Sequence, residues 1–193
     1  MKLRQILSTY LTYYPNDCET LSLLMGQVKA QTDAELKSRK NYLGHFTTSS
    51  FLICQDTKRV LLVEHKILGE MFQPGGHIEA SDANTLDSAL RELREETGVN
   101  LKALNYKCLI SDQVLIPFNI ELQLIPANHK KHEDSHCHYD MHYLFFIDKE
   151  PVIDIDYVES NNYQWVEWGD FIKMPRFIKV AEKVNLVDNW CCL

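Results

Sequence analysis

The sequence has no C-x-x-C pair, although it contains six cysteines. They are Cys18, Cys54, Cys108, Cys137, Cys191 and Cys192. This scatter argues against a zinc knuckle or a thioredoxin-like redox site and is typical of a cytosolic chain. A C-a-a-X lipidation signal is also missing, because Trp190 stands where that signal requires cysteine. Prenylation is therefore not expected.

Long apolar runs are absent as well. No stretch approaches the roughly 20 apolar residues that a transmembrane helix requires. Residues 1–10 carry basic side chains, but polar residues interrupt the apolar core of a signal peptide. We therefore expect a protein that does not enter a membrane and that stays in the cytoplasm.

Basic residues are outnumbered, since 20 Lys and Arg stand against 27 Asp and Glu and give a net charge of -7. This is the wrong sign for a protein that holds nucleic acid by its overall field, so no nucleic-acid partner is expected. Gly and Pro are few, at 7 and 6, and no internal repeat is present. With 45% hydrophobic residues, a chain of 193 residues can build one sizeable core.

The pattern of apolar and polar residues changes once along the chain. Residues 1–40 alternate apolar and polar positions at helical spacing, which predicts an N-terminal helical extension of two helices. Residues 41–193 form the second part. There, 46–54 and 59–64 are rich in β-branched and aromatic residues and flank a polar turn, which predicts a hairpin.

The clearest helix is expected over residues 85–97. Its apolar positions follow one face, Asn84 can cap its first turn, and Gly98 can take the left-handed conformation after its end. Further strands and one helix are expected around it. The strands are at 107–114, 120–125, 138–147 and 163–167, and the helix covers 168–187 with Pro175 disturbing it. The pattern is mixed α/β.

Residues 75–96 are crowded with carboxylates, six against only two arginines. On a helix, Glu92 shares a face with Glu95 and Glu96, at spacings of three and four residues. Their oxygens can therefore converge on a hard divalent cation such as Mg²⁺. The alternative is a solvated helix face with local ion pairs, as most such charge runs are. The glycine turn before the helix and the caps at its two ends favour the metal site.

Residues 76–99 resemble the signature of the Nudix hydrolases, G-x5-E-x7-R-E-U-x-E-E-x-G-U, where U is a bulky aliphatic residue. The part from Arg91 to Val99 matches at every fixed position. Two departures precede it: Asp82 stands at the glutamate position, and eight residues rather than seven separate it from Arg91. The resemblance implies a Nudix-type α/β/α sandwich with a mixed sheet. It also implies Mg²⁺- or Mn²⁺-dependent hydrolysis of a diphosphate linkage, with metal-activated water attacking phosphorus.

The resemblance assigns roles to the residues of this box. Glu92, Glu95 and Glu96 match its acidic helix positions and are expected to ligate metal, with Glu92 and Glu95 also taking part in catalysis. Arg91 matches the box arginine and is expected to orient a glutamate by paired hydrogen bonds. The role of Asp82 stays open.

The glycine turn before the helix adds further candidates. In folds of this kind the carbonyl of Gly75 lies near the metal, and an acid at the position of Glu79 is frequent in the family, so both are expected metal ligands. His77 lies next to the glycines and is expected to contact substrate phosphates. Its alternative role is to cap the turn.

A histidine-rich stretch follows later in the chain. His136, His138, Asp140 and His142 alternate on an expected strand and so point to one face. Imidazole suits Zn²⁺ and can donate to anions. We therefore expect His136 and His138 to bind substrate, with solvent-facing or internally hydrogen-bonded histidines as the alternative.

The expected function is hydrolysis of a small nucleoside diphosphate derivative. One rival is an isomerase of the isopentenyl diphosphate kind, which has a similar fold and would need Cys54 or Cys108 at the metal site. The other is a binding module that senses a nucleotide diphosphate without cleaving it; the shifted spacing before Arg91 is its only support. The N-terminal segment could pack as an extension, cover the site or make a homodimer contact.

Overall fold

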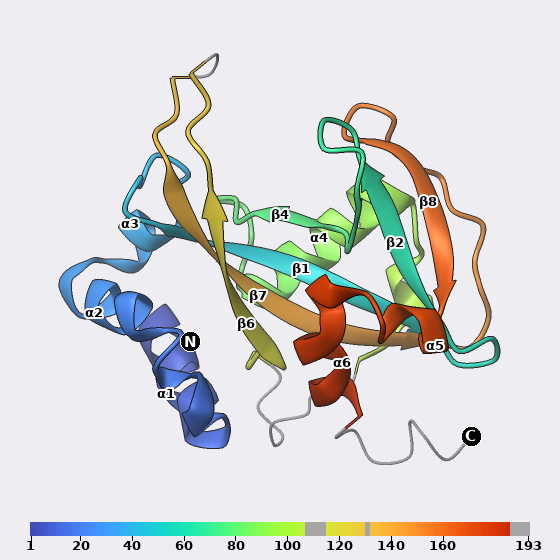
Figure 1. The fold of residues 1–193 in the computed structure, drawn as a ribbon, viewed down its shortest axis with the longest axis horizontal. Helices are drawn as coiled ribbons and strands as arrows, with labels where there is room; N and C mark the ends of the chain where they lie inside the picture. The colour runs from blue at the N-terminus through green and yellow to red at the C-terminus, as the bar shows by residue number, and fades with distance from the viewer. Residues whose placement is uncertain (107–114, 130–131, 186–193) are drawn as a thin grey trace.

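The computed structural model describes residues 1–106, 115–129 and 132–185 (Figure 1). Its helices are α1 (Leu3–Tyr13), α2 (Ser22–Ala30), α3 (Asp33–Lys37), α4 (Thr85–Thr97), α5 (Trp168–Phe171) and α6 (Ile178–Val184). Its strands are β1 (His45–Cys54), β2 (Arg59–His65), β3 (Met71–Phe72), β4 (Gly75–His77), β5 (Asn105–Tyr106), β6 (Asn119–Ile125), β7 (His136–Ile147) and β8 (Ser160–Glu167). Short 3-10 turns lie at Pro15–Cys18, Leu101–Ala103 and Pro175–Phe177. The strand expected at 107–114 falls outside the described residues.

The strands form one mixed sheet of eight, with β1 near its middle. β1 runs parallel to β7 over its whole length, in a register that pairs His45 with His138 and Cys54 with Ile147. Along its other edge it pairs antiparallel with β2 and with β4. The hairpin of β1 and β2 confirms the prediction for residues 46–64. β8 pairs with the far edge of β2, β3 pairs with the end of β2 on the edge that faces β1, and β5 and β6 pair with β7.

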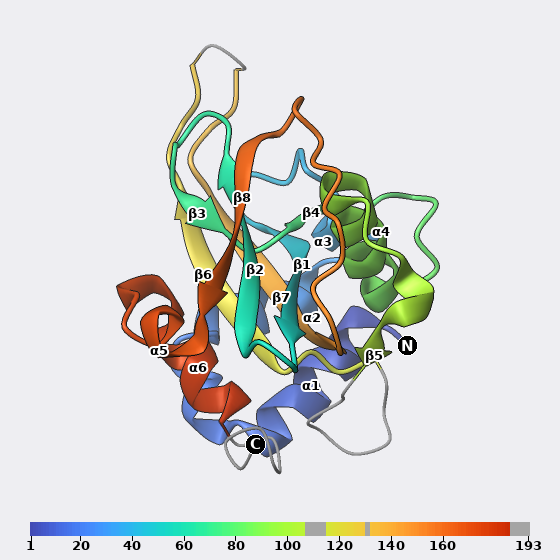
Figure 2. The same cartoon turned by 90° about the vertical axis from the view of Figure 1, so that its right-hand side faces the viewer.

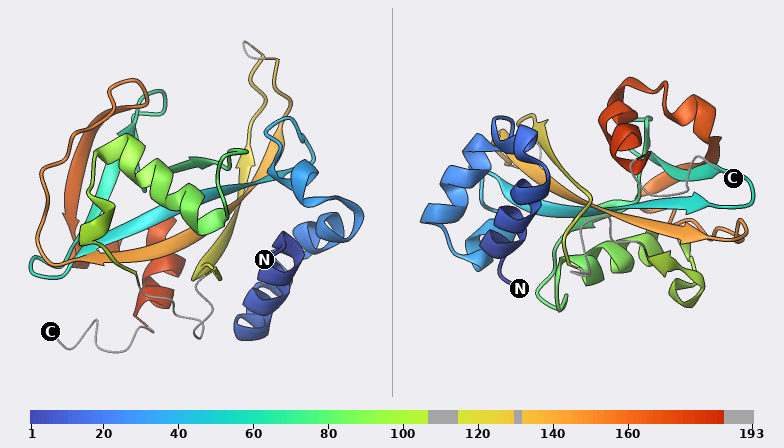
Figure 3. Two further views of the ribbon diagram at one scale, coloured as in Figure 1. Left: turned by 180° about the vertical axis from the view of Figure 1, so that it is seen from behind. Right: turned by 90° about the horizontal axis from the view of Figure 1, so that it is seen from below.

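Helices cover the two faces of this sheet. Seen from below, α4 lies on one side and α5 and α6 lie on the other (Figure 3). The α4 side is fixed by polar contacts from β1, where the Thr48 hydroxyl lies 2.9 Å from that of Ser88 and the Ser50 hydroxyl donates to the Ala89 carbonyl. On the opposite face Phe51 packs against aromatic rings of the C-terminal helical segment. The expected α/β/α sandwich with a mixed sheet is confirmed.

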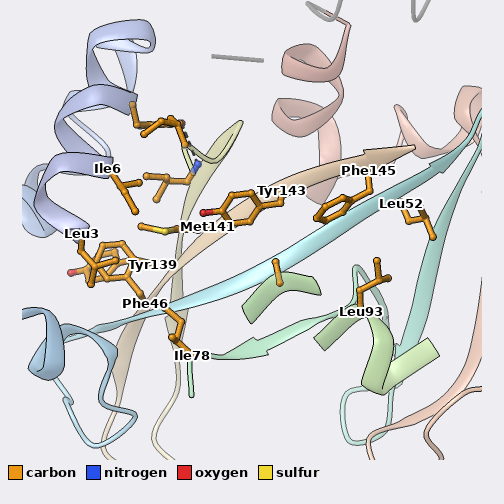
Figure 4. Close-up of a cluster of buried hydrophobic side chains, with 14 of the residues drawn as sticks. Leu3, Ile6, Phe46, Leu52, Ile78, Leu93, Tyr139, Met141, Tyr143 and Phe145 are labelled. Atoms are coloured by element: carbon orange, nitrogen blue, oxygen red, sulfur yellow. Dashed lines mark hydrogen bonds between the residues drawn. The ribbon is translucent and has the colours of Figure 1, made fainter. Parts of the chain in front are cut away.

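The N-terminal helices complete the larger of two apolar cores. They gather at one end of the sheet (Figures 1 and 2). Leu3 and Ile6 of α1 are buried beside Tyr139 and Met141 of β7, so β7 turns these apolar side chains away from its histidines (Figure 4). Helices therefore precede the sheet, as the apolar spacing indicates. The division of the chain at residue 40 stays a prediction.

Helix α4 has the bounds that its sequence predicts. The Asn84 side chain accepts a hydrogen bond of 3.0 Å from the Asp87 amide, which caps the first turn. Gly98 ends the helix in the left-handed conformation, with φ of 66°. A side chain at Gly98 would also meet the chain at Asp154, where an added Cβ would lie 2.9 Å from the Cβ of that residue.

The expectation of a single helix over 168–187, disturbed at Pro175, is wrong for the part up to residue 185; residues 186 and 187 fall outside the described residues. The chain forms the short α5, a 3-10 turn at Pro175–Phe177 and then α6. Pro175 has no amide hydrogen to continue a helix, but it suits the first position of a new one, so it divides the segment. None of the helices within the described ranges is both long enough and apolar enough to span a bilayer.

Candidate active site

Two glutamates of α4 point into the molecule and face the glycine strand β4. Glu92 is 8% exposed and Glu96 is 6% exposed, and they lie one helical turn apart. The Gly75 amide donates a 2.6 Å hydrogen bond to Glu96. A Cβ on Gly76 would lie 2.6 Å from Glu92 Oε1, so a side chain there would displace this carboxylate. The glycine turn and the helix therefore build one site, as expected.

A third carboxylate reaches the same place from the segment before β8. Oxygen atoms of Glu92, Glu96 and Glu159 all lie within 4.8 Å of one another. We call these three residues the carboxylate cluster. The chain before Glu159 docks onto the end of α4, where the amide of Asp156 donates to the carbonyl of Glu96 at 3.1 Å. The Ser160 hydroxyl lies 3.5 Å from Glu96 on the far side.

Burial sets the electrostatics of the carboxylate cluster. It raises the pKa of Glu92 to about 7, and it raises the pKa of Glu96 to about 8 with further help from the charges of Glu92 and Glu159. Closely spaced, poorly hydrated carboxylates are costly to ionise together unless a cation offsets them. Their hard oxygen donors fit Mg²⁺ or Mn²⁺.

Arg91 binds the carboxylates of the site together. Its guanidinium donates to Glu92 at 3.0 Å and to Glu95 at 2.8 Å. It also donates to the carbonyl of His77 at 2.9 Å, which links α4 to the end of β4. Hydrogen bonds, first of all to Asp82, raise the pKa of Arg91, so its charge is permanent. The guanidinium therefore orients acidic groups, as the box arginine is expected to do.

Asp82, which departs from the box pattern, has a definite partner. It receives two hydrogen bonds from Arg91, at 2.9 and 3.1 Å, and a third from the Glu79 amide at 2.8 Å. Burial alone would raise the pKa of Asp82, but these bonds outweigh it and lower that pKa. Asp82 therefore positions the arginine, and the extra residue of the loop leaves this pairing intact.

The other expected ligands occupy more open positions. The Glu95 side chain is 52% exposed and is held by Arg91 at the rim. Glu79 is exposed, with its carboxylate 3.3 Å from the Ser81 hydroxyl, and it is not among the carboxylates that approach one another closely in the described ranges. Gly75 contacts Glu96 through its amide rather than its carbonyl.

The histidines expected to bind substrate gather on the sheet face opposite α4, because His77 pairs with Thr47, which alternates with the β1 residues that contact α4. His77, His136 and His138 meet at the start of β7, together with His45 of β1. We call these four residues the histidine cluster. His45 was not expected, because its place in the cluster depends on the β1–β7 register rather than on its neighbours in sequence. Glu159 was missed because it reaches the site through the docking of its segment on the end of α4, which no local pattern shows.

Cys54 does not lie at the site. It is buried in the larger core, where its thiol donates to the Asp148 carbonyl at 3.3 Å. Cys108, the other cysteine that an isomerase could use, falls outside the described residues.

Comparison with known proteins agrees with this geometry. The sequence profile of the NUDIX domain matches residues 45–185. The chain is 27% identical over 124 residues to "Probable DHNTP pyrophosphohydrolase" of Lactococcus lactis subsp. cremoris (strain MG1363), which covers 64% of this chain and 67% of that protein.

Solved structures share the fold. A NUDIX family hydrolase from Clostridium perfringens matches 75% of this chain and 98% of its own, with a TM-score of 0.54 and 23% identity. The E. coli dihydroneopterin triphosphate pyrophosphohydrolase matches 74% and 93%, with a TM-score of 0.54 and 17% identity. Since the domain match extends over most of the sequence and contains the box helix, the chain belongs to the Nudix family of hydrolases.

Proposed function

We propose that this enzyme hydrolyses a phosphoanhydride bond in a nucleoside diphosphate derivative and depends on Mg²⁺ or Mn²⁺. The observation that carries the proposal is the burial of Glu92 and Glu96 against the glycine strand, with Glu159 beside them. Three carboxylates in one poorly hydrated place match the donor set of a hard divalent cation. Bound there, the cation would neutralise the polyanionic substrate, polarise a phosphoryl oxygen and lower the pKa of an attacking water.

The protein's own residues have separable roles in this proposal. Glu92 and Glu96 hold the cation, and the Gly75 amide keeps one carboxylate of the pair in place. Glu95 stands at the exposed rim, where its free oxygen can accept a proton from water. Arg91 fixes the direction of Glu92 and Glu95 without contacting the substrate. His77 and His138, which were expected to bind substrate, project from the sheet face opposite α4, so the proposal gives them no contact with the reacting phosphate.

The substrate class rests on charge complementarity and on the names of similar proteins. A carboxylate site accepts a polyphosphate only with cations between them, which favours diphosphate derivatives over uncharged compounds. Similar proteins are named for hydrolysis of DHNTP and of dihydroneopterin triphosphate. A cytoplasmic location and the absence of a nucleic-acid partner stay predictions.

We also propose that residues 1–40 act as a structural extension. Leu3, Ile6 and Tyr10 are fully buried, and the Tyr139 hydroxyl on β7 donates to Gln27 of α2 at 2.9 Å. These contacts lie on the sheet face opposite the histidine cluster. The extension therefore stabilises the sheet on the face that also carries α4. The mass of the protein in solution tests whether it makes a homodimer contact.

A substrate panel tests the proposal. Purified enzyme is incubated with nucleoside triphosphates, ADP-ribose, dinucleoside polyphosphates and dihydroneopterin triphosphate, in Mg²⁺, Mn²⁺ or chelator, and the phosphate products are separated. We expect cation-dependent cleavage of at least one compound, lost in Glu96→Gln and retained in Glu182→Gln. Glu182 is an exposed helical glutamate outside the site, so it controls for the change of charge.

Two other outcomes would replace this function. If no compound is cleaved but one of them raises the melting temperature, the chain is a binding module. If isopentenyl diphosphate is converted to its isomer without phosphate release, the chain is an isomerase.

A further inference from the structure

The histidine cluster joins three strands that are far apart in sequence. The ring of His45 lies 4.6 Å from that of His138 and 5.1 Å from that of His77, centroid to centroid. His136 adds a fourth ring, 5.0 Å from His138 and 5.1 Å from His45. Four of the eight histidines of the chain thus meet in one place. Strand pairing alone does not call for histidine at these four positions, since other polar residues could occupy the same sheet face.

Hydrogen bonds to the main chain define which nitrogen of two rings is available. Nδ1 of His136 lies 2.7 Å from the Asp134 carbonyl, and Nδ1 of His45 lies 3.3 Å from the Asn41 carbonyl. A carbonyl oxygen only accepts, so each Nδ1 carries the hydrogen. In the neutral ring the lone pair then belongs to Nε2. A main-chain carbonyl that holds Nδ1–H is the usual outer partner of a metal-binding histidine.

One of these lone pairs has no partner within the described residues. His45 is 0% exposed, and its Nε2 is buried with no hydrogen bond. Leaving a buried polar atom unpaired costs about 1–3 kcal/mol. Nε2 of His136 points at Nε2 of His138 across 3.2 Å. These two nitrogens can share one hydrogen, whereas the unpaired Nε2 of His45 is what a metal ion would satisfy.

The charge state of the rings suits metal binding. Burial is the main cause that lowers the pKa of His45, of His77 to about 4 and of His138 to about 3, with repulsion among the imidazoles adding to it. These rings are therefore neutral near pH 7 and keep their lone pairs. A metal needs the neutral form of imidazole as its ligand.

We propose that His45, His77 and His138 bind a divalent transition metal, and that Zn²⁺ fits best. Ligand nitrogens of these three lie within 4.8 Å of one another. With Zn–N bonds of about 2.0–2.1 Å, nitrogens of a tetrahedral site are roughly 3.3 Å apart. The ligand nitrogens of these three rings therefore need to approach one another by up to about 1.5 Å. Nitrogen donors select Zn²⁺ over Mg²⁺.

A buried anion next to the cluster favours a cation there. Asp140, two residues after His138, is 3% exposed. Its oxygens accept hydrogen bonds from Thr47, Ser49, Gln73 and His142. Its negative charge acts on both His77 and His138. Because charge interactions are strong in a poorly hydrated interior, Asp140 would stabilise a dication held by otherwise uncharged rings.

The zinc site is distinct from the carboxylate cluster but adjoins it through β4. The carbonyl of His77 accepts from Arg91, while the preceding Gly75 and Gly76 touch Glu96 and Glu92. Zn²⁺ would therefore tie β1, β4 and β7 together and hold the glycine strand against α4. This role goes beyond phosphoanhydride hydrolysis and does not depend on the identity of the substrate.

Metal binding by the full chain tests the proposal. Protein stripped with a chelator is titrated with Zn²⁺ in an excess of Mg²⁺, and bound metal is measured by mass spectrometry. We expect about one Zn²⁺ per chain and a higher melting temperature with it. His77→Ala and His138→Ala should lose this Zn²⁺, whereas His129→Ala should keep it because His129 is exposed and outside the cluster. Glu96→Gln should also keep it.

Two results would overturn the site: equal Zn²⁺ binding by all three alanine variants, or loss of Zn²⁺ in Glu96→Gln alone. If a variant fails to fold, a measurement on the wild-type protein still tests the proposed zinc site. The ¹⁵N chemical shifts of the buried histidine rings should change on addition of Zn²⁺. Unchanged chemical shifts at saturating Zn²⁺ would contradict the proposal.

Discussion

The carboxylate cluster and the histidine cluster meet along β4, and burial acts on them in opposite directions. It raises the pKa of Glu92 and Glu96 and lowers the pKa of His77 and His138. In each cluster the uncharged form is favoured, since desolvation penalises whichever form carries charge. The uncharged imidazoles keep the lone pairs that a metal needs, whereas the carboxylates must lose a proton before they can hold a cation. Carboxylate oxygens suit Mg²⁺, and neutral imidazoles suit Zn²⁺.

The clusters also differ in what removing a ligand should do. A cation in the carboxylate cluster would serve the reaction, so loss of Glu92 or Glu96 is expected to act on turnover. The histidine cluster joins three strands, so loss of its metal is expected to act on stability. Measuring turnover and melting temperature for each variant would separate the two clusters.

The largest expected effect is on turnover. We predict that Glu96→Gln or Glu92→Gln lowers kcat by more than about a hundredfold, because each removes a negatively charged donor while keeping the shape of the side chain. Steady-state rates in saturating Mg²⁺ measure the loss. Glu182→Gln should retain the rate of the wild type. Near-normal turnover in both site variants would remove the carboxylate cluster from the mechanism.

A smaller loss is expected from Arg91→Lys. The ammonium group of lysine cannot reproduce the hydrogen bonds that the planar guanidinium of Arg91 donates to Asp82, Glu92 and Glu95. We predict a fall in kcat of about 10–100-fold, with a weaker apparent affinity for Mg²⁺. The matched control is Arg94→Lys, since Arg94 is exposed on the same helix. If excess Mg²⁺ leaves the rate of Arg91→Lys equal to that of the control, the arginine does not position the acids.

The carboxylate cluster could be predicted in large part because its helix is local in sequence. The spacing of Glu92 and Glu96, the cap at Asn84 and the ending at Gly98 all depend on neighbours within a few residues. The family and the enzyme class followed from the same stretch and are confirmed. Periodicity likewise placed α4 and the hairpin of β1 and β2, whereas the sandwich that they belong to was implied by the family resemblance.

Positions that depend on tertiary pairing were not predictable in this way. His45 reaches the histidine cluster through the β1–β7 register, and Glu159 reaches α4 because the chain at Asp156 docks on the helix end. Neither residue is marked by a motif or by spacing. Pro175 was noticed, but only the three-dimensional path shows that it divides the last helix. Local sequence patterns therefore predicted the helices and strands, whereas the contacts between them could be seen only in the three-dimensional structure.

Stability without metal offers a sharper test of the carboxylate cluster. We predict that Glu96→Gln raises the melting temperature of chelator-treated protein by several degrees near neutral pH and above. The folded-state pKa of Glu96 is raised from 4.5 to about 8, so folding disfavours the charged form. The gain should thus be full above about 8, decline as the pH falls, and vanish below 4.5.

Melting curves over that range, with Glu182→Gln as control, measure this gain. Addition of Mg²⁺ should make the melting temperature of the wild type the higher of the two, because the wild type then binds the ion and the variant does not. A variant that is less stable than the wild type at every pH, with or without Mg²⁺, would show that Glu96 is a structural residue.

The smallest effect on turnover should come from Glu159→Gln. This variant tests whether the three carboxylates of the cluster contribute equally to turnover. Unlike Glu92 and Glu96, Glu159 is exposed, so water screens its charge and its contribution to holding a cation is reduced. We predict a loss of turnover of roughly fivefold or less, equivalent to about 1 kcal/mol. The comparison is with Glu96→Gln in the same Mg²⁺ titration. An equally large loss in both would mean that Glu159 loses its hydration when the cation binds, and that the loop before β8 closes on the site.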